Sequence, residues 1–331
     1  MQVRSYEEEV SRWKKLMEKL EEQERAGIKV EIWPSPPDPR DFDLARLEKV
    51  AVRLPVKLPD VVVLHPSPIV MDQGGQPFCG GAAGASIGNA HYDNLDRMPD
   101  GGFSMRYTYW KSKEYDGIPD KPGTYLRTVC KVMQKYGLLP DALLPFEDVP
   151  DKPEITSEMD EKAKKYRVKA YARLWSLDEI KQALNDGFYV LIGTIVTSEN
   201  WNTDDGFLSW PQGFILGGHA TKLFGYDDRL KKHVHVGYLF GLNSWGKKWG
   251  DGGRFYMPYD YYEWESADMP GFKVFQEAWA LEFEEVGPKP DPVEPEPKPD
   301  PVEPEPKPER PKLMVLLEKL IRWLVSLFRR K

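Results

Sequence analysis

Residues 4–25 carry a regular alternation of hydrophobic and polar positions. Glu, Lys and Arg lie between apolar residues that recur at alternating steps of four and three, namely Tyr6, Val10, Trp13, Met17 and Leu20. This spacing places the apolar residues on one face of a 3.6-residue helix, so it predicts an amphipathic helix. The helix is expected to end at Gly27, because residues 33–40 (WPSPPDPR) are rich in proline, which cannot continue a helix. An extended segment is predicted there.

Residues 58–285 have the mixed pattern of a folded body. β-Branched runs such as 189–196 (YVLIGTIV) predict strands, and residues 126–136 have a helical pattern that stops at Gly137. The 331 residues are 40% hydrophobic, which is enough for a substantial core.

Residues 288–311 differ sharply from this body. They repeat PKPDPVEPE twice and continue as PKPERP. Proline at nearly every second position favours an extended polyproline II helix of ~3.1 Å per residue, which makes this segment a semi-rigid spacer of roughly 70 Å. A disordered tail is the alternative.

The last segment, 312–331 (KLMVLLEKLIRWLVSLFRRK), predicts a helix with a wide apolar face and a narrow polar stripe. Internal charges at Glu318, Lys319 and Arg322 argue against a transmembrane span, which needs ~20 predominantly apolar residues. The sequence leaves two alternatives for what the apolar face binds. One is an anionic membrane surface, with Trp323 at the interface, and the other is a groove on a partner protein.

Composition and charge narrow the class of protein. Asp and Glu number 53 against 46 Lys and Arg, a net charge of −7, which argues against nucleic acid as a partner. Residues 1–20 lack the apolar stretch and cleavage site of a secretory signal. We therefore expect a cytoplasmic protein with no signal peptide, which associates peripherally with a membrane if the C-terminal helix binds lipid.

The chain has two cysteines, Cys79 and Cys130, which excludes a disulfide framework. Residues 72–85 (DQGGQPFCGGAAGA) predict a loop that enters a helix at Cys79. A thiol at a helix N-terminus has a lowered pKa, which favours the nucleophilic thiolate. A lone cysteine is more often a small buried hydrophobe, and Cys130, inside an apolar helical pattern, fits that description.

A thiolate nucleophile needs a base, and histidine is the usual one. His91 follows Cys79 by twelve residues on the same expected helix, so the rise of 1.5 Å per residue separates them by ~18 Å. His65 lies in an exposed extended stretch. His219 stands in GGHATKLF, at the start of an apolar strand where glycines allow close approach, and it is the candidate base.

His233 and His235 point to the same side of a strand in HVH, but no cluster of further ligands accompanies them at metal-binding spacing. We read them as residues of a hairpin. No metal and no organic cofactor is expected.

Three blocks occur in order along the chain, and together they carry a resemblance. They are QGGQPFC at 73–79, GGHA at 217–220 and NSWG at 243–246. In these blocks the sequence resembles the papain-like cysteine peptidases. Among them it is most similar to the short bacterial and viral members.

The resemblance implies roles for individual residues. Cys79 is the nucleophile, His219 is the general base and later the acid, and Asn243 orients the imidazole. Gln73, six residues before Cys79, supplies an amide N–H that stabilises the oxyanion together with the backbone N–H of Cys79. Trp245 shields the hydrogen bond between Asn243 and His219 from water.

The same resemblance places Gly217 and Gly218 in the substrate-binding cleft, together with Trp245. The sequence also departs from the family pattern. Gly80 replaces the usual tryptophan after the nucleophile, and Pro77 and Phe78 occupy positions that are normally small. Gln76 stands where many relatives have a disulfide cysteine.

The implied fold class is α+β. It is a papain-like two-lobed fold, in which a helical lobe carries the nucleophile helix, a β-barrel-like lobe carries His and Asn, and the active site lies in the cleft. The expected organisation is an N-terminal segment at 1–57, a peptidase domain at 58–287, the linker 288–311 and the helix 312–331. The N-terminal segment either covers the cleft as an inhibitory segment or packs permanently on the body. The expected activity is hydrolysis of peptide bonds in a peptide or protein substrate. The alternative is a catalytically silent scaffold that acts as a tethered binding module.

Overall fold

The computed structural model describes residues 6–25, 32–38, 41, 57–265 and 273–285. The chain divides into two units, 1–286 and 287–331. The linker 288–311 and the helix 312–331 lie outside the described residues. Among the described residues, no helix is long and apolar enough to cross a membrane.

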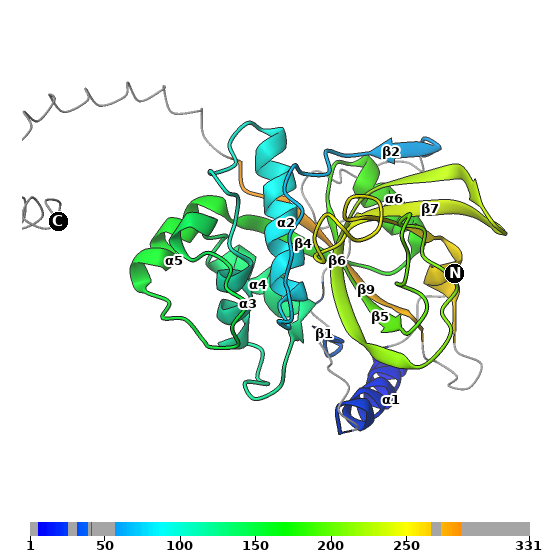
Figure 1. Ribbon diagram of the computed structural model, residues 1–331, viewed down its shortest axis with the longest axis horizontal. Coiled ribbons are helices and arrows are strands. Elements are labelled where there is room, and N and C mark those ends of the chain that lie inside the picture. The colour runs from blue at the N-terminus through cyan, green and yellow to red at the C-terminus, as the bar shows by residue number, and fades with distance from the viewer. Residues whose placement is uncertain (1–5, 26–31, 39–40, 42–56, 266–272, 286–331) are drawn as a thin grey trace, which may run out of the picture. The chain divides into compact units, whose positions relative to one another are not determined.

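The first unit combines helices with one antiparallel sheet (Figure 1). Its elements, in chain order, are α1 (Tyr6–Arg25), β1 (Ile32–Trp33), β2 (Val61–Val63), α2 (Cys79–Asn94), α3 (Met105–Lys113), β3 (Thr124–Tyr125), α4 (Leu126–Lys135), the 3-10 helix η2 (Asp141–Leu143), α5 (Ser157–Ala163), the 3-10 helix η3 (Lys164–Tyr166), β4 (Val168–Leu174), α6 (Leu177–Asn185), β5 (Val190–Thr197), β6 (Ile215–Lys232), β7 (His235–Leu242), β8 (Arg254–Pro258), α7 (Asp260–Glu263) and β9 (Phe275–Phe283).

Two lobes are distinguished by their elements. The helical lobe comprises α2, α3, α4 and α5 with their loops, and the β lobe is the sheet ordered β4-β9-β5-β6-β7-β8, with β2 beside β6. Figure 1 shows α2 at the centre, with the other helices of its lobe on one side and the sheet on the other. The sequence-based expectation of an α+β fold with helices first and strands later is confirmed.

Small residues make α2 the packing axis of the molecule. A side chain at Gly81 would meet the backbone oxygen of Met105 at 2.4 Å, and one at Gly88 would meet Leu138 at 2.2 Å. The glycine- and alanine-rich sequence of α2 therefore lets α3 and the segment after α4 approach closely. This tight packing holds the helix and its first residue, Cys79, in place.

Each lobe has its own apolar core. The core around α2 consists of α2, α3 and α4 residues with the ends of several strands, whereas a second core lies between the sheet and α6. Cys79 belongs to the first core, and so do Ala220 and Leu242, the neighbours of His219 and Asn243 in the chain. The helix that begins at Cys79 therefore meets the sheet at the part of β6 and β7 that carries the other candidate residues.

The N-terminal segment is a structural part of this unit. Leu16 and Leu20 of α1 pack in a third apolar cluster with Trp33, Tyr125 and residues of β5 and β6. The short strand β1 pairs in parallel with β3, with Ile32 opposite Thr124 and Trp33 opposite Tyr125. The predicted helix and extended segment are thus both present among the described residues.

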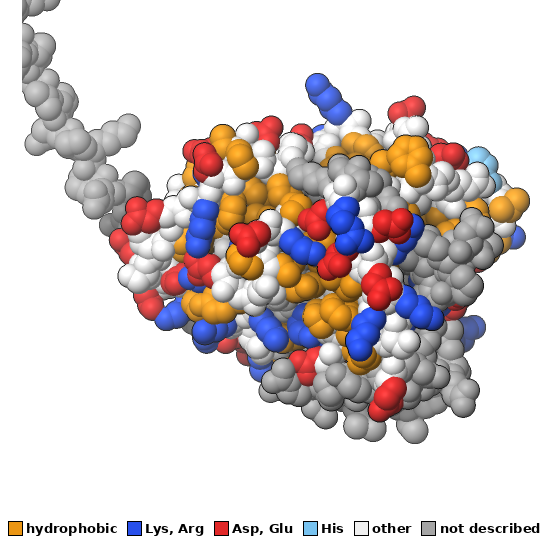
Figure 2. All heavy atoms as spheres, turned by 90° about the horizontal axis from the view of Figure 1, so that it is seen from below, with side chains coloured by type: hydrophobic (Ala, Val, Ile, Leu, Met, Phe, Trp, Pro, Cys, Tyr) orange, Lys and Arg blue, Asp and Glu red, His pale blue; other side chains and the backbone are white. Residues whose placement is uncertain are grey.

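The surface of this unit mixes charges of both signs. On the face shown in Figure 2, the coloured Lys and Arg side chains are interspersed with Asp and Glu side chains. Such a face lacks the single-sign field that attracts a polyanion.

Candidate active site

Cys79 is the first residue of α2 and is completely buried. The preceding residue, Phe78, is the N-cap, and its side chain makes no capping hydrogen bond. The first turn of α2 contains no acidic residue, so the positive end of the helix dipole is not neutralised there. The helix dipole acts in favour of the thiolate of Cys79, whereas burial of the sulfur acts in the opposite direction.

His219 and Asn243 form a buried hydrogen bond. The Nε2 atom of His219 lies 2.7 Å from Oδ1 of Asn243, and the two residues are 1% and 2% exposed. Because the amide oxygen accepts, Nε2 carries the hydrogen, and Nδ1 is the nitrogen that accepts a proton. The same amide oxygen accepts a hydrogen bond from the backbone N of Ser244 at 2.8 Å, which fixes its direction.

Strand pairing explains how two residues so far apart in the chain meet. Asn243 follows Leu242, the last residue of β7, and Leu242 pairs with Lys222 on β6, three residues beyond His219. The backbone N of Asn243 also donates to the oxygen of Gly253 at 2.8 Å. The sheet register therefore sets the position of both residues.

Two tryptophans enclose this hydrogen bond. The ring of Trp245 stacks on the imidazole of His219 at 4.7 Å and 29°, and the ring of Trp201 meets it edge-on at 5.3 Å and 88°. Burial lowers the pKa of His219 to about 4, and the hydrogen bond with Asn243 acts in the opposite direction. The imidazole is consequently neutral at neutral pH and able to accept a proton.

Gln73 lies on the loop before α2 and is 1% exposed. Its side-chain oxygen accepts a hydrogen bond from the hydroxyl of Ser244 at 2.7 Å, and its Nε2 donates to the backbone oxygen of Gln76 at 2.8 Å. Its backbone N donates to the oxygen of Ser244 at 2.9 Å. The loop of Asn243 and the loop before Cys79 are therefore tied together through Gln73.

Sequence reasoning missed Ser244 and Trp201. Ser244 is adjacent to Asn243 in the NSWG block, so its role could have been sought there. Trp201 lies in the polar stretch SENWNTDD. A single large aromatic residue in such a stretch was the feature that could have pointed to a buried contact.

Gly217 and Gly218 lie on β6 and pair with Val196 and Ile195 on β5. The φ angle of Gly217 is +153°, a conformation that side chains rarely adopt, which explains the glycine at this position. Both residues are buried and directly precede His219 on the strand.

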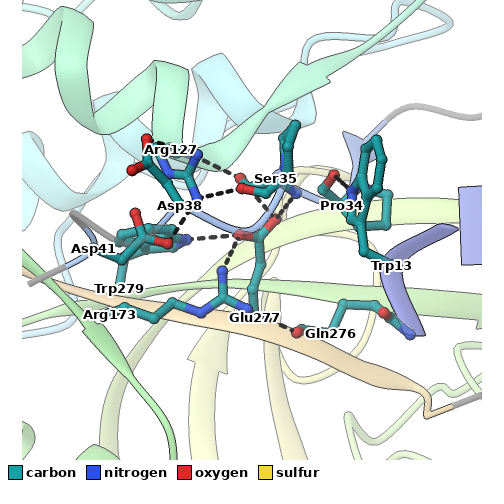
Figure 3. A network of polar contacts seen from close by, with 11 residues as sticks. Trp13, Pro34, Ser35, Asp38, Asp41, Arg127, Arg173, Gln276, Glu277 and Trp279 are labelled. Atoms are coloured by element: carbon teal, nitrogen blue, oxygen red, sulfur yellow. Dashed lines mark hydrogen bonds and ion pairs between the residues drawn. The ribbon is translucent and has the colours of Figure 1, made fainter. Parts of the chain in front are cut away.

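The segment after β1 is held between the lobes by a network of polar contacts (Figure 3). The backbone N and the hydroxyl of Ser35 donate to Oε1 of Glu277 on β9 at 3.1 and 3.2 Å. The backbone N of Arg127 on α4 donates to the same hydroxyl at 3.1 Å, and the Arg127 guanidinium contacts Asp41 at 2.6 Å. Figure 3 shows Glu277 facing Ser35. The other carboxylate oxygen of Glu277 contacts Nη1 of Arg173 at 2.9 Å.

This network joins three separate parts of the chain. Arg127 also donates to the backbone oxygen of Pro36, and Trp13 of α1 donates from Nε1 to the oxygen of Pro34 at 2.8 Å. Burial raises the pKa of Asp41, while the Arg127 charge opposes that rise. The N-terminal segment is thus bonded to both the helical lobe and the β lobe.

The remaining histidines lie elsewhere. His91 is on α2 and stacks on Phe283 at 4.3 Å. His65 is half-buried, whereas the sequence predicts an exposed residue. The difference arises because its ring hydrogen-bonds Asp93 on α2 at 2.5 Å. His233 and His235 belong to a hairpin, as expected, but the prediction that they point to the same side of a strand is wrong. His233 lies in the turn between β6 and β7 with a φ angle of +54°, and His235, the first residue of β7, pairs with Asp260 at 2.8 Å.

Cys130 is fully buried on α4, and burial raises the pKa of its thiol. Within the described ranges, no group of three or more His, Cys, Asp and Glu residues is arranged to hold a metal ion.

Comparison with known proteins identifies peptidase-like relatives. No family model matches the chain. It is 27% identical over 173 residues to an uncharacterised peptidase C1-like protein of Acanthamoeba polyphaga mimivirus, and 26% identical over 208 residues to a cathepsin B-like protein of Giardia intestinalis. These matches cover 48% and 58% of the chain and span 54% and 65% of the relatives.

Solved structures show the same fold. Xylellain, a cysteine protease from Xylella fastidiosa, matches with a TM-score of 0.64 and 24% identity, over 77% of this chain and 96% of its own. A procathepsin B from Trypanosoma congolense matches with a TM-score of 0.59 and 16% identity, over 78% of this chain and 86% of its own. The chain therefore has the two-lobed fold of the papain-like cysteine proteases. The resemblance that the three sequence blocks indicate is confirmed.

Proposed function

We propose that this protein is a cysteine peptidase that hydrolyses peptide bonds in a peptide or protein substrate. The observation that carries the proposal is the buried hydrogen bond of 2.7 Å between His219 and Asn243, beside the helix that begins at Cys79. An imidazole oriented by an amide and enclosed by tryptophan rings is suited to accept a proton from a thiol.

In the proposed reaction, the Cys79 sulfur forms a bond to the substrate carbonyl carbon after its proton passes to His219. Gln73 and the backbone N–H of Cys79 stabilise the negative oxygen that results. The C–N bond then breaks, His219 gives its proton to the leaving amine, and an acyl thioester remains. A water molecule attacks the thioester after losing a proton to His219, and the thiol is released with the carboxylic acid product.

Labelling with iodoacetamide and cleavage of a fluorogenic peptide library test the proposal together. We expect labelling at Cys79 and cleavage by the wild-type chain, and neither by Cys79→Ala. Cys130→Ala is the matched control, because it removes the other thiol and leaves the site intact. A folded wild-type chain that is not labelled and cleaves nothing would favour the silent scaffold that Pro77, Phe78 and Gly80 suggest.

We further propose that the N-terminal segment restrains the activity. Ser35 and its neighbours hydrogen-bond both Arg127 of the helical lobe and Glu277 of the β lobe, and β1 packs beside β6, the strand of His219. A substrate that enters between the lobes must displace this segment.

The test uses two substitutions in the full chain, Trp33→Ala with Ser35→Ala, which weaken the docking of the segment. Peptide cleavage should become faster, whereas Lys14→Ala on the exposed side of α1 should leave the rate unchanged. A lower melting temperature with an unchanged rate would support permanent packing instead of inhibition.

We also propose that the C-terminal helix, 312–331, attaches the peptidase to an anionic membrane surface through the spacer 288–311. The support is its sequence, in which basic side chains accompany a wide apolar face. Flotation of the full chain and of a 1–287 truncation with anionic and neutral vesicles tests it. Only the full chain should float, and it should do so with anionic vesicles. A full chain that stays at the bottom while remaining monodisperse contradicts membrane attachment and leaves a protein groove as the partner.

A further inference from the structure

The loop that precedes Cys79 contacts a second loop of the helical lobe, residues 144–148. The side chain of Asp148 accepts hydrogen bonds from Nε2 of Gln76 at 2.9 Å and from the backbone N of Gly75 at 3.3 Å, both at the same oxygen. Phe146 packs edge-on against Phe78, with ring centroids 6.3 Å apart. The two loops thus meet at two places along their length.

The contact at Gly74 shows how closely the loops approach. Gly74 has a φ angle of +57°, and a side chain there would lie 2.9 Å from the carboxyl carbon of Asp148. The glycine therefore permits both the turn and the nearness of the carboxylate.

Residues 144–148 are themselves anchored to the start of α3. Ser104, the N-cap of α3, donates from its hydroxyl to the backbone oxygen of Leu144. Arg106, whose side chain is 8% exposed, contacts Glu147 at 2.6 Å. Asp148 is thus part of a loop that is itself attached to α3.

Gln76 connects this loop to Gln73. Its side-chain amide donates to Asp148, and its backbone oxygen accepts the hydrogen bond of 2.8 Å from Nε2 of Gln73. Ser244 holds the oxygen of the same Gln73 amide from the β lobe. The orientation of that amide therefore depends on a series of hydrogen bonds that ends at Asp148. Gln76 is also the residue at the position where many relatives have a disulfide cysteine, so hydrogen bonds hold this part of the loop here.

We propose that Asp148 is a positioning residue for the oxyanion-stabilising amide of Gln73. The proposal rests on the proposed peptidase function. Asp148 does not touch the substrate. It acts through Gln76, and its effect is confined to the step in which negative charge develops on the substrate oxygen.

Three variants test this role in the full chain. Asp148→Ala removes the acceptor, Asp148→Asn keeps an acceptor oxygen without the charge, and Asp151→Ala is a control at an exposed carboxylate three residues beyond the loop. We expect Asp148→Ala to lower kcat about tenfold with little change in KM, which is less than the roughly 10²- to 10³-fold cost of losing an oxyanion donor itself. Asp148→Asn should restore most of kcat, and Asp151→Ala should behave as wild type.

Two probes separate positioning from general damage to the site. A peptide aldehyde adds to the Cys79 thiol, with the S–C bond forming and the thiol proton passing to the carbonyl oxygen, which then lies where the oxyanion lies. Its affinity should fall about tenfold in Asp148→Ala. Iodoacetamide alkylates the thiolate without forming an oxyanion, so its rate should not change.

The double variant Gln73→Ala with Asp148→Ala should be no slower than Gln73→Ala alone, because Asp148 acts through Gln73. Equal kcat and aldehyde affinity in wild type and Asp148→Ala would overturn the proposal. So would a parallel loss of iodoacetamide reactivity, or Asp148→Asn as slow as Asp148→Ala. Failure of the peptidase function itself is a distinct result, since the wild-type chain would then neither cleave peptides nor react with iodoacetamide.

Discussion

The two walls of the candidate site stabilise their polar groups in different ways. On the β-lobe wall, His219 and Asn243 are almost completely buried beneath the rings of Trp201 and Trp245. On the helical-lobe wall, Gln73 is buried, but the hydrogen bonds that extend from it through Gln76 to Asp148 end at the surface.

This difference has an energetic consequence. A hydrogen bond between buried groups leaves an unsatisfied partner when it is broken, whereas water replaces a lost partner at the surface. Substitutions in the β-lobe wall should therefore affect both activity and stability. Those at the surface end of the helical-lobe wall, at Gln76 and Asp148, should affect mainly the rate of the chemical step.

The largest expected effect is at the base. His219→Ala should abolish peptide cleavage in the folded protein, because no other group would take the proton from the Cys79 thiol. Steady-state assay with the fluorogenic peptide measures it, and circular dichroism checks that the variant is folded. Wild-type turnover in a folded His219→Ala protein would contradict the assigned role.

The next largest effects are expected for one substitution in each wall, which allows a direct comparison of the two walls. Asn243→Ala and Gln73→Ala should each leave a measurable remainder, with kcat reduced roughly 10²- to 10³-fold. Asn243→Ala should lower the free energy of unfolding more than Gln73→Ala. The Asn243 oxygen accepts from two buried donors, whereas one of the two side-chain hydrogen bonds of Gln73 is only partly buried. Urea denaturation of both variants measures the difference, and equal destabilisation would remove the distinction between the walls.

The stability of the β-lobe wall should depend on pH. Burial lowers the pKa of His219 from 6.5 to about 4, so below pH 6.5 the unfolded chain binds a proton that the folded chain does not. This contribution to stability is complete above pH 6.5 and falls as the pH drops to about 4, by about 3 kcal/mol in total. His219→Gln should show a shallower decline over this range. Parallel curves for the two proteins would refute the prediction.

The smallest effect is expected at Trp201. Trp201→Phe leaves a ring beside His219 but creates space, while it also removes an indole N–H that has no partner among the described residues. These changes oppose each other, so we expect a loss of about 1 kcal/mol in the free energy of unfolding. The pKa of His219 should move toward its ordinary value, because water reaches the ring more easily. Thermal unfolding and the pH dependence of stability measure both changes, and a pKa that stays near 4 would show that Trp201 does not exclude water.

Local patterns identified much of the fold because their causes are local. The helix of residues 6–25 follows from an apolar spacing, and the end of α4 follows from Gly137, whose φ angle of +89° suits glycine. Cys79 was recognisable because a glycine-rich loop that enters an apolar helix is a local feature. The hydrogen bond between His65 and Asp93 was not predictable, because the two residues are 28 positions apart in the chain.

The sequence by itself indicated the class of chemistry that we propose. The residue types Gln73, Cys79, His219 and Asn243, with their order and immediate neighbours, are properties of the chain and need no folding to be read. Only the tertiary structure decided what surrounds them. The register of β6 with β7 brings His219 to Asn243, and Trp201 covers the imidazole from a separate loop. Asp148 reaches the nucleophile loop across 72 residues of chain. Contacts of this kind depend on packing between elements far apart in sequence, and local spacing carries no information about them.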